Sequence, residues 1–292
     1  MSDYVIVTDS TADLPGQIFS ELGVEVVPME FMVGNQTCQH YADAREMSFE
    51  EFYTRVKAGE KVSTTQINYY TYETVFSPIL ERGQDILYIC FSSGLSGTYQ
   101  ASCMAAGELM EKYPGRKIVS IDSLCASVGE GLLVYLAALQ KKAGMGFEEM
   151  EKWVLDHRLK VRHWFVVDDL DHLRQGGRIS AAQAILGTAL GVKPLLSVDT
   201  EGKLVSAAKL RGTKKILDTF CQKMETEADK SELQTVIVGH AANLEMAEKL
   251  KDTLLERGLI RDAIIADIGP IIGAHVGAGM FALVFMSDQD LA

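Results

Sequence analysis

Four hydroxyl side chains and two glycines lie together in residues 92–98, directly after the apolar run 86–91. A short apolar run of this kind is typical of a buried strand, and a helix is predicted from Gly97 onward. Glycine lets a backbone approach a ligand closely, and the N-terminus of a helix favours negative charge. The loop therefore has the composition of an anion-binding site.

Two other hydroxyl-rich segments, residues 8–11 and 63–66, stand at the ends of predicted strands or helices. Ser, Thr and Asp favour turns and helix caps for local reasons, so one such segment alone indicates little. Three of them in the first half of the chain favour a shared site, because ligands of open α/β sheets lie at the carboxyl ends of the strands.

Two glycine-containing segments carry basic or titratable side chains. Residues 173–180 place Arg174 and Arg178 on either side of a Gly-Gly pair, and residues 269–279 place His275 among four glycines. An arginine fork suits carboxylates and phosphates, although an exposed turn with solvated arginines is the alternative. A lone histidine is usually structural, but flanking glycines favour the close approach of backbone or ligand.

Several familiar motifs are absent from the sequence. It has no G-x-x-x-x-G-K-[ST] for ATP, no G-x-G-x-x-G after a strand, and no G-x-S-x-G typical of hydrolases. His157, His163 and His172 lack a common metal-ligand spacing. The chain thus has the donors of a binding site without a motif for a nucleotide, a metal or a catalytic base, and we expect no cofactor and no metal.

The chain of 292 residues carries a formal net charge of −12, with 47% hydrophobic and 23% charged residues. This composition is ordinary for a globular protein, and the negative charge disfavours nucleic acid as a partner. The charge is uneven, because residues 172–215 hold eight basic side chains against two acidic ones. This segment favours an anionic ligand or an acidic protein surface, unless it only neutralises acids packed nearby.

Five scattered cysteines without a C-x-x-C pair favour reduced thiols over a disulfide framework or a zinc site. No basic N-terminal region followed by an apolar core indicates a signal peptide, and no apolar run approaches the length of a membrane span. We therefore expect a cytoplasmic protein without stable membrane insertion.

The order of elements predicts an α/β protein with two domains. Up to residue 160 strands and helices alternate, which predicts a mainly parallel sheet flanked by helices. After it, a hairpin signal at residues 200–203 predicts a mixed α/β sandwich. The predicted domains are residues 1–160, with the hydroxyl-rich loops, and 161–292, with the arginine-rich turn and the Gly/His loop. Strands are expected at residues 4–8, 24–28, 85–91, 117–122, 163–167, 195–199, 204–209, 235–240, 264–268 and 282–285.

Five segments in this order closely resemble the DegV family of bacterial fatty-acid-binding proteins. They are VTDSTADLP (7–15), VSTTQ (62–66), SSGLSGTY (92–99), LRQGGRIS (173–180) and IGPIIGAHVG (268–277). The resemblance runs essentially from end to end. The second segment departs from the family's usual Ser-Thr-Ser-Gln-Pro, because isoleucine stands in place of the proline.

The resemblance implies a two-domain protein that buries a long-chain fatty acid and is not itself an enzyme. It implies the acyl-binding subunit of a fatty acid kinase, which presents the carboxylate to a separate ATP-binding subunit. That subunit forms acyl phosphate for phospholipid metabolism, and the binding protein is expected to be a monomer when free. The resemblance implies that carboxylate-binding hydroxyls are Thr64 and Ser93. The full set of expected ligand-binding residues is Thr64, Thr65, Ser92, Ser93, Gly94, Gly273 and His275, with Arg174, Arg178 and Arg211 facing the partner or the transferred phosphate.

Burial of the acyl tail contributes roughly 0.8 kcal/mol per CH₂, so the head group needs only neutral donors for orientation. Two alternatives remain open. One is a stand-alone hydrolase of acyl esters that uses Ser93 or Ser96 with His275. The other is a sensor whose lipid occupancy controls a protein partner, which the basic segment fits equally well.

Overall fold

A parallel sheet forms the first part of the chain in the computed structural model, which describes residues 3–168, 170–180 and 191–291. Its strand order is β2-β1-β6-β7, and all its neighbouring strands are parallel. Every residue of β1 and β6 is buried, as expected for parallel strands that helices cover on both faces. The strands are β1 (Tyr4–Asp9), β2 (Glu25–Val27), β6 (Asp85–Cys90) and β7 (Ile118–Asp122), and the helices around them are α1 (Gly16–Leu22), α3 (Tyr69–Glu81), α4 (Thr98–Lys112), α5 (Val128–Lys142) and α6 (Phe147–His157).

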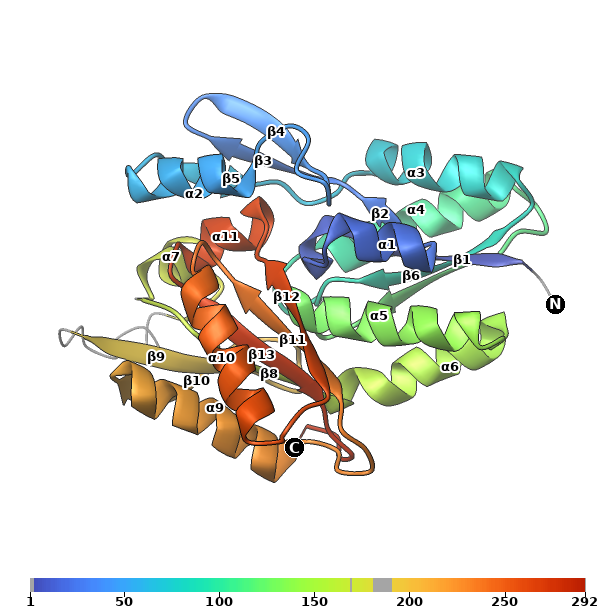
Figure 1. Ribbon diagram of the computed structural model, residues 1–292. Helices are drawn as coiled ribbons and strands as arrows, with labels where there is room; N and C mark the ends of the chain where they lie inside the picture. Colours follow the sequence, from blue (N-terminus) through green and yellow to red (C-terminus); the bar gives the residue numbers. More distant parts are fainter. Residues whose placement is uncertain (1–2, 169, 181–190, 292) are drawn as a thin grey trace.

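A small antiparallel sheet, whose strands are not among those expected from the sequence, lies at one end of the first sheet (Figure 1). It has three strands in the order β4-β3-β5. Its strands are short, and alternating burial in β3 shows that only one of its faces is packed. Thr64 ends β5 and pairs with Phe31 of β3. The elements are β3 (Met29–Val33), β4 (Gln36–His40), β5 (Val62–Thr64) and the adjoining helix α2 (Phe49–Lys57).

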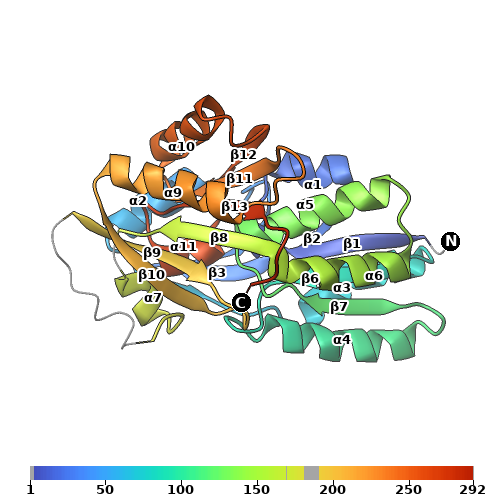
Figure 2. The ribbon, with the colours of Figure 1, turned by 90° about the horizontal axis from the view of Figure 1, so that it is seen from below.

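A mixed sheet of six strands forms the second part, in the order β10-β9-β8-β13-β11-β12. The predicted hairpin is present, because β9 and β10 are antiparallel and join through a turn with Gly202 at φ 71°. Helices α9 and α10 cover its outer face (Figure 2). The α/β fold class, with a parallel and a mixed sheet, is confirmed. The elements are β8 (Val161–Val166), β9 (Val192–Val198), β10 (Leu204–Arg211), α9 (Thr213–Glu227), β11 (Thr235–His240), α10 (Leu244–Glu256), β12 (Asp262–Asp267) and β13 (Phe281–Met286).

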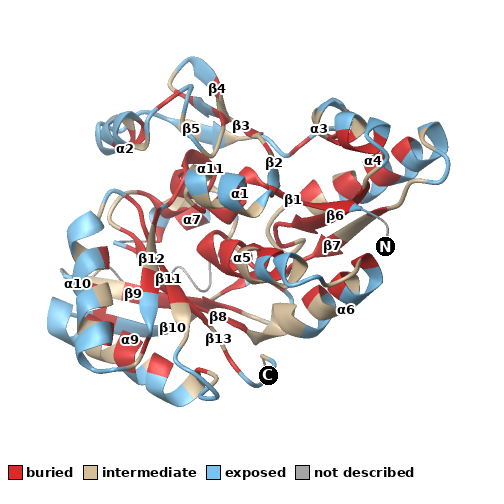
Figure 3. Ribbon diagram, turned by 45° about the vertical axis from the view of Figure 1, so that its right-hand side comes forward, coloured by how far each residue is buried: buried red, intermediate tan, exposed pale blue. Residues whose placement is uncertain are grey.

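Helix α5 lies between the two large sheets and contacts strands of both (Figure 3). One hydrophobic core therefore runs continuously from Ile6 of β1 through Leu133 of α5 to Val284 of β13. The domain division at residue 160 falls at the end of the 3-10 turn η2 (Arg158–Lys160), directly before β8. The division of the chain into two domains at this residue stays a prediction. None of the described helices is long and apolar enough to cross a membrane.

Residues 270–276, expected to be part of a glycine-rich loop, form the short helix α11 (Pro270–Val276). Pro270 stands in its first turn, where a proline needs no backbone hydrogen bond. The helix packs against α2, β3, β5 and α7 (Asp171–Gln175), so it joins the small sheet to the second part of the chain. Tyr53 of α2 donates a hydrogen bond of 2.7 Å to the carbonyl of Ile268, just before α11.

Three carboxyl groups are buried where β1 ends and α5 begins. They belong to Asp9, Asp13 and Glu130, which are 0%, 5% and 0% exposed. Burial raises the pKa of all three, well above the usual range for Glu130 and to about 8 for Asp13. Hydrogen bonds to Asp9 from Thr11, Tyr88 and Phe91 oppose its rise, whereas Asp9 and Asp267 add to that of Asp13. Protonation thus relieves much of the cost of burial.

The close contact of α11 with α2 predicts a cost for any side chain at Gly273. A Cβ there would lie 2.6 Å from the Tyr53 hydroxyl and 2.8 Å from Phe52. We expect Gly273→Ala to lower the free energy of unfolding by about 1–3 kcal/mol, because the packed rings must shift. The matched control is Gly107→Ala in α4, where a Cβ meets nothing within 4 Å. Alanine should there stabilise the helix by about 0.5–1 kcal/mol. Equal effects at both positions in denaturant titrations would refute this assignment.

The raised pKa of the buried carboxyl groups predicts that folding takes up protons. The pKa of Asp13 is about 8 when folded, against about 3.9 in an unfolded chain. The proton bound by Asp13 stabilises the folded state fully when the pH is below the pKa of the unfolded chain. This stabilisation declines as the pH rises to the pKa of the folded state, by at most about 1.4 kcal/mol per pH unit for each such group. The free energy of unfolding from urea titrations should therefore fall between about pH 7 and pH 8. His40 and His163 contribute little there, because burial lowers their pKa to about 3 and about 4.

Asp13→Asn separates this carboxyl group from the others. The amide oxygen can still accept from the Gly269 N–H, its NH₂ group can donate to Ser127, and asparagine tolerates φ 50°. In this variant we expect the free energy of unfolding to depend less steeply on pH, by the contribution of one proton. A slope equal to that of the wild type, or a large loss of stability at pH 7, would show that Asp13 is ionised in the folded state.

Candidate ligand-binding site

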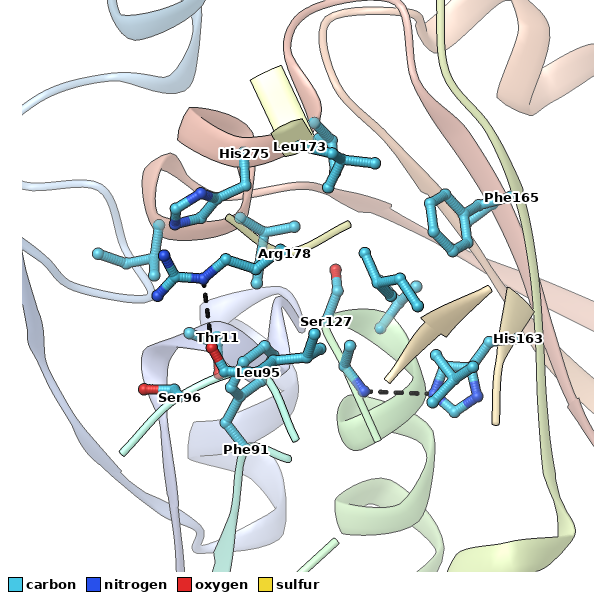
Figure 4. A pocket seen from close by; sticks show the side chains of 18 of the residues that line it. Thr11, Phe91, Leu95, Ser96, Ser127, His163, Phe165, Leu173, Arg178 and His275 are labelled. Carbon is cyan, nitrogen blue, oxygen red and sulfur yellow. Dashed lines mark hydrogen bonds between the residues drawn. The ribbon is translucent and has the colours of Figure 1, made fainter. Parts of the chain in front are cut away.

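A cavity of about 280 Å³ lies between the first sheet, the small sheet and the second sheet. Its wall draws on residues from Thr11 to Val284, so no short segment of the chain forms it alone. Most of the wall is apolar, and Figure 4 shows Phe91, Leu95, Phe165 and Leu173 around the space. Cavities of this kind, mostly apolar with a few convergent polar groups, are typical of small-molecule sites.

Polar side chains converge on one region of the wall. Thr64 comes from the end of β5, His275 from α11, and Arg178 from the segment after α7. Thr64 Oγ1 lies 3.2 Å from His275 Nε2. Gln66 and Ser96 also line the wall, and Ser96 lies near Arg178 in Figure 4. The structure thus brings together Thr64 and His275, predicted as ligand-binding residues, and Arg178, predicted to face a partner.

Arg178 is held in place by the backbone. Its Nε donates to the carbonyl of Leu95 at 3.2 Å, and its Nη1 donates to the carbonyl of Gly176. Leu95 belongs to the hydroxyl-rich loop before α4, so these bonds tie the arginine-rich turn to that loop. The guanidinium therefore places a fixed positive charge at the polar region of the cavity.

His275 is neutral at physiological pH. Burial, followed by the nearby charges of Arg178 and His172, lowers its pKa to about 4. Its Nδ1 is buried, packs against Gly176, and has no hydrogen-bond partner among the described residues. A neutral imidazole can donate from one nitrogen and accept at the other, so His275 adds a hydrogen bond without adding charge.

Ser92, Ser93 and Gly94 form the first half of the hydroxyl-rich loop, whereas the cavity wall is built from its second half, Leu95 to Gly97. Ser92 Oγ donates to the carbonyl of Gly202 at 2.8 Å, which fixes the loop to the β9–β10 turn. Ser93 donates its backbone N–H to Asp122 Oδ1 at 3.0 Å. A ligand role for these three residues stays a prediction.

The remaining predicted residues lie outside the cavity wall. Thr65 is exposed and its backbone N–H donates to the carbonyl of Glu30 at 3.0 Å. Gly273 faces α2. Arg174 is exposed and its Nη2 lies 3.3 Å from Asp171 Oδ1. Arg211 is exposed at the last position of β10, whereas the cavity-lining Leu204 stands at the first position of that strand. Their predicted roles remain untested.

The expected set of ligand-binding residues lacks five polar residues of the wall, namely Thr11, Gln66, Ser96, Ser127 and His163. Thr11 belongs to a hydroxyl-rich segment, which was a usable signal. Ser127 stands at φ 54° directly before α5, and a serine in the sequence gives no indication of such a backbone angle. His163 on β8 accepts a hydrogen bond of 3.3 Å from the Ala126 N–H (Figure 4), and burial lowers its pKa to about 4.

No group of three His, Cys, Asp or Glu side chains within residues 3–168, 170–180 and 191–291 is arranged to hold a metal ion. The site therefore offers neutral hydrogen-bond donors and acceptors, one fixed cation and a large apolar surface. Such a combination suits an amphipathic molecule with a small anionic end.

The known proteins that this chain resembles are DegV proteins, and they match it over nearly its whole length. A DegV domain-containing protein of Clostridium perfringens is 38% identical over 288 residues, which cover 99% of both chains. The structure of a DegV family protein from Thermus thermophilus, described as fatty acid binding, has a TM-score of 0.85 at 29% identity and covers 98% of this chain and 100% of its own. Bacillus subtilis DegV, described as a fatty acid binding protein, has a TM-score of 0.84 at 26% identity, with 99% and 100% covered.

The sequence profile described as "uncharacterised protein, DegV family" matches residues 3–288, nearly the whole chain. The ordered motifs, the two large sheets and the full-length relatives all agree with this match. The chain belongs to the DegV family.

Proposed function

We propose that this protein binds a long-chain fatty acid in the cavity, with the carboxylate at Thr64, His275 and Arg178. The observation that carries the proposal is the convergence of these three side chains on an otherwise apolar cavity. Full-length relatives from Thermus thermophilus and Bacillus subtilis are described as fatty acid binding, which supports the same ligand class.

The chemistry of the two regions divides the work of binding. A tail of about a dozen buried CH₂ groups contributes on the order of 10 kcal/mol before the entropy of association is subtracted. The Thr64 hydroxyl and a neutral His275 orient the carboxylate, and Arg178 supplies a charge-assisted hydrogen bond. Arg178 is already bonded to two carbonyls, so it is positioned before the ligand arrives.

We infer that the protein is a carrier without its own catalytic activity, and that it presents the carboxylate to a separate ATP-binding kinase subunit. Gln66 and Gly97 line the cavity and are also exposed, which places its polar region near the surface. Arg174 lies on the exposed side of the same turn as Arg178 and suits a partner or a transferred phosphate. In this proposal the free protein is a cytoplasmic monomer, and acyl phosphate serves phospholipid synthesis.

The geometry favours the hydrolase alternative less. A serine nucleophile needs a histidine that is itself oriented by a third group. His275 Nε2 contacts Thr64 instead of a serine, and no described carboxylate contacts its Nδ1. Ser96 Oγ lies 2.9 Å from Thr98 Oγ1, so it too lacks a base. A lipid sensor uses the same cavity and differs only in its partner.

Arg178→Gln tests the head-group site. We expect fatty acid copurified with the wild type, identified by mass spectrometry, and a palmitate affinity that falls roughly 10-fold or more in the variant because a charge-assisted hydrogen bond is lost. Arg174→Gln is the matched control and should bind palmitate like the wild type. Hexadecanol lacks the negative charge, so its affinities for Arg178→Gln and Arg174→Gln should differ far less than those of palmitate. Equal losses for palmitate and hexadecanol in Arg178→Gln would contradict carboxylate recognition.

The kinase proposal predicts the opposite pattern for Arg174. With palmitate-loaded protein, ATP and the ATP-binding subunit of the same organism, Arg174→Gln should lower the rate of acyl phosphate formation several-fold. The reason is that an exposed positive charge at the presenting surface is lost, while palmitate stays bound. Full activity of Arg174→Gln would remove this residue from the proposed surface. Absence of phosphorylation with every ATP-binding partner, together with capture of a regulator, would favour the sensor.

A further inference from the structure

The apolar cavity has an end that lies away from the proposed carboxylate site. Figure 4 shows His163 of β8 on the opposite side of the space from His275 and Arg178. The side chain of His163 is 5% exposed and lines the cavity wall. An acyl tail that starts at a carboxylate held by His275 and Arg178 therefore runs toward His163.

The wall of the cavity ends at the same level on two neighbouring strands. His163 of β8 and Val284 of β13 are cross-strand partners, and both line the cavity. Side chains alternate between the two faces of a sheet, so the next pair on this face is Val161 and Met286. Neither of them lines the cavity, and both pack in the hydrophobic core. On these strands the space therefore stops at His163 and Val284.

Helix α5 closes the same end from another side. Val128, its first residue, lines the cavity, whereas Leu132, about one turn further along, is 1% exposed in the core. The ring of His163 joins β8 to this helix, because its Nε2 accepts a hydrogen bond of 3.3 Å from the Ala126 N–H. A Cβ on Gly129 would lie 1.9 Å from the same nitrogen, so the ring packs directly against the helix backbone. His163 is therefore held in place at the end of the cavity.

This end wall carries no charge. Burial lowers the pKa of His163 to about 4, so the ring is neutral at physiological pH. Its Nε2 is occupied by the Ala126 N–H, and its cross-strand partner Val284 is apolar. A hydrocarbon chain can therefore pack against the wall up to van der Waals contact.

We propose that His163 and Val284 limit the length of the acyl tail, so that the cavity selects fatty acids by chain length. This inference rests on the proposed function and adds a property of the same site. Each buried CH₂ raises the affinity about 4-fold while the tail is still short of the wall. A longer tail must displace a packed ring or leave methylene groups unpacked, so the gain per CH₂ then disappears.

The test measures the affinities of the even-numbered saturated fatty acids from octanoate to docosanoate, below their micelle concentrations, by displacement of a fluorescent fatty acid at neutral pH. We expect the wild-type affinity to rise about 4-fold per CH₂ up to one chain length and to stay level or fall beyond it. His163→Ala should move this limit to longer chains by roughly two carbons, because the tail can fill the space that the ring leaves. Val284→Ala should move it in the same direction and leaves the hydrogen bond of Ala126 intact, so it decides the test if His163→Ala does not fold.

Leu95→Ala is the matched control, because Leu95 lines the cavity beside Arg178 and its carbonyl still accepts from that side chain (Figure 4). It should weaken the binding of all chain lengths by a similar factor and leave the limit where it was. A wild-type affinity that rises through the whole series, or a limit that stays in place in the folded variants of His163 and Val284, overturns the end wall. In both cases the binding of fatty acids leaves the proposed function intact, whereas failure to bind any of them refutes the proposed function itself.

Discussion

The hydrogen bonds at the junction of β1, η1 and α5 hold the rest of the structure in register. Thr8 and Thr11 bind Glu130 of α5, and Ser127 binds Asp13, which also accepts from the backbone N–H of Gly269 before α11. These bonds connect the first sheet to the helix that separates the two sheets, and to the helix that carries His275. The apolar and polar parts of the cavity both depend on this junction.

Burial of three carboxyl groups is an expensive way to build a junction. The backbone is strained at the same place, with φ 50° at Asp13, 54° at Leu124 and 54° at Ser127. Strain and buried polar groups gather at sites where function requires a fixed geometry. Here the strained backbone and the buried carboxyl groups lie directly behind the cavity wall.

The sequence was informative where local chemistry decides structure. Apolar runs revealed the long strands, the Thr-Glu-Gly-Lys turn revealed the β9–β10 hairpin, and the ordered motifs led to Thr64, Arg178 and His275. The small sheet was missed because its short strands pack on one face only. Helix α11 was missed because Gly273 is there for contact with α2, which local patterns do not reveal. Proximity of Ser127 to Asp13 is a tertiary fact that residue spacing does not encode.

The bond from Ser92 Oγ to the carbonyl of Gly202 joins the loop before α4 to the turn of a hairpin 110 residues further along the chain. The bond from Arg178 to Leu95 makes a second connection of the same kind. Any motion that draws the two sheets apart breaks both. Exchange of ligand by that route therefore meets a barrier to which both bonds contribute, and the second bond also influences affinity because Arg178 and Leu95 line the cavity. Ser92 and Gly202 lie outside the cavity wall, so the first bond can set how fast a ligand enters and leaves without setting how tightly it binds.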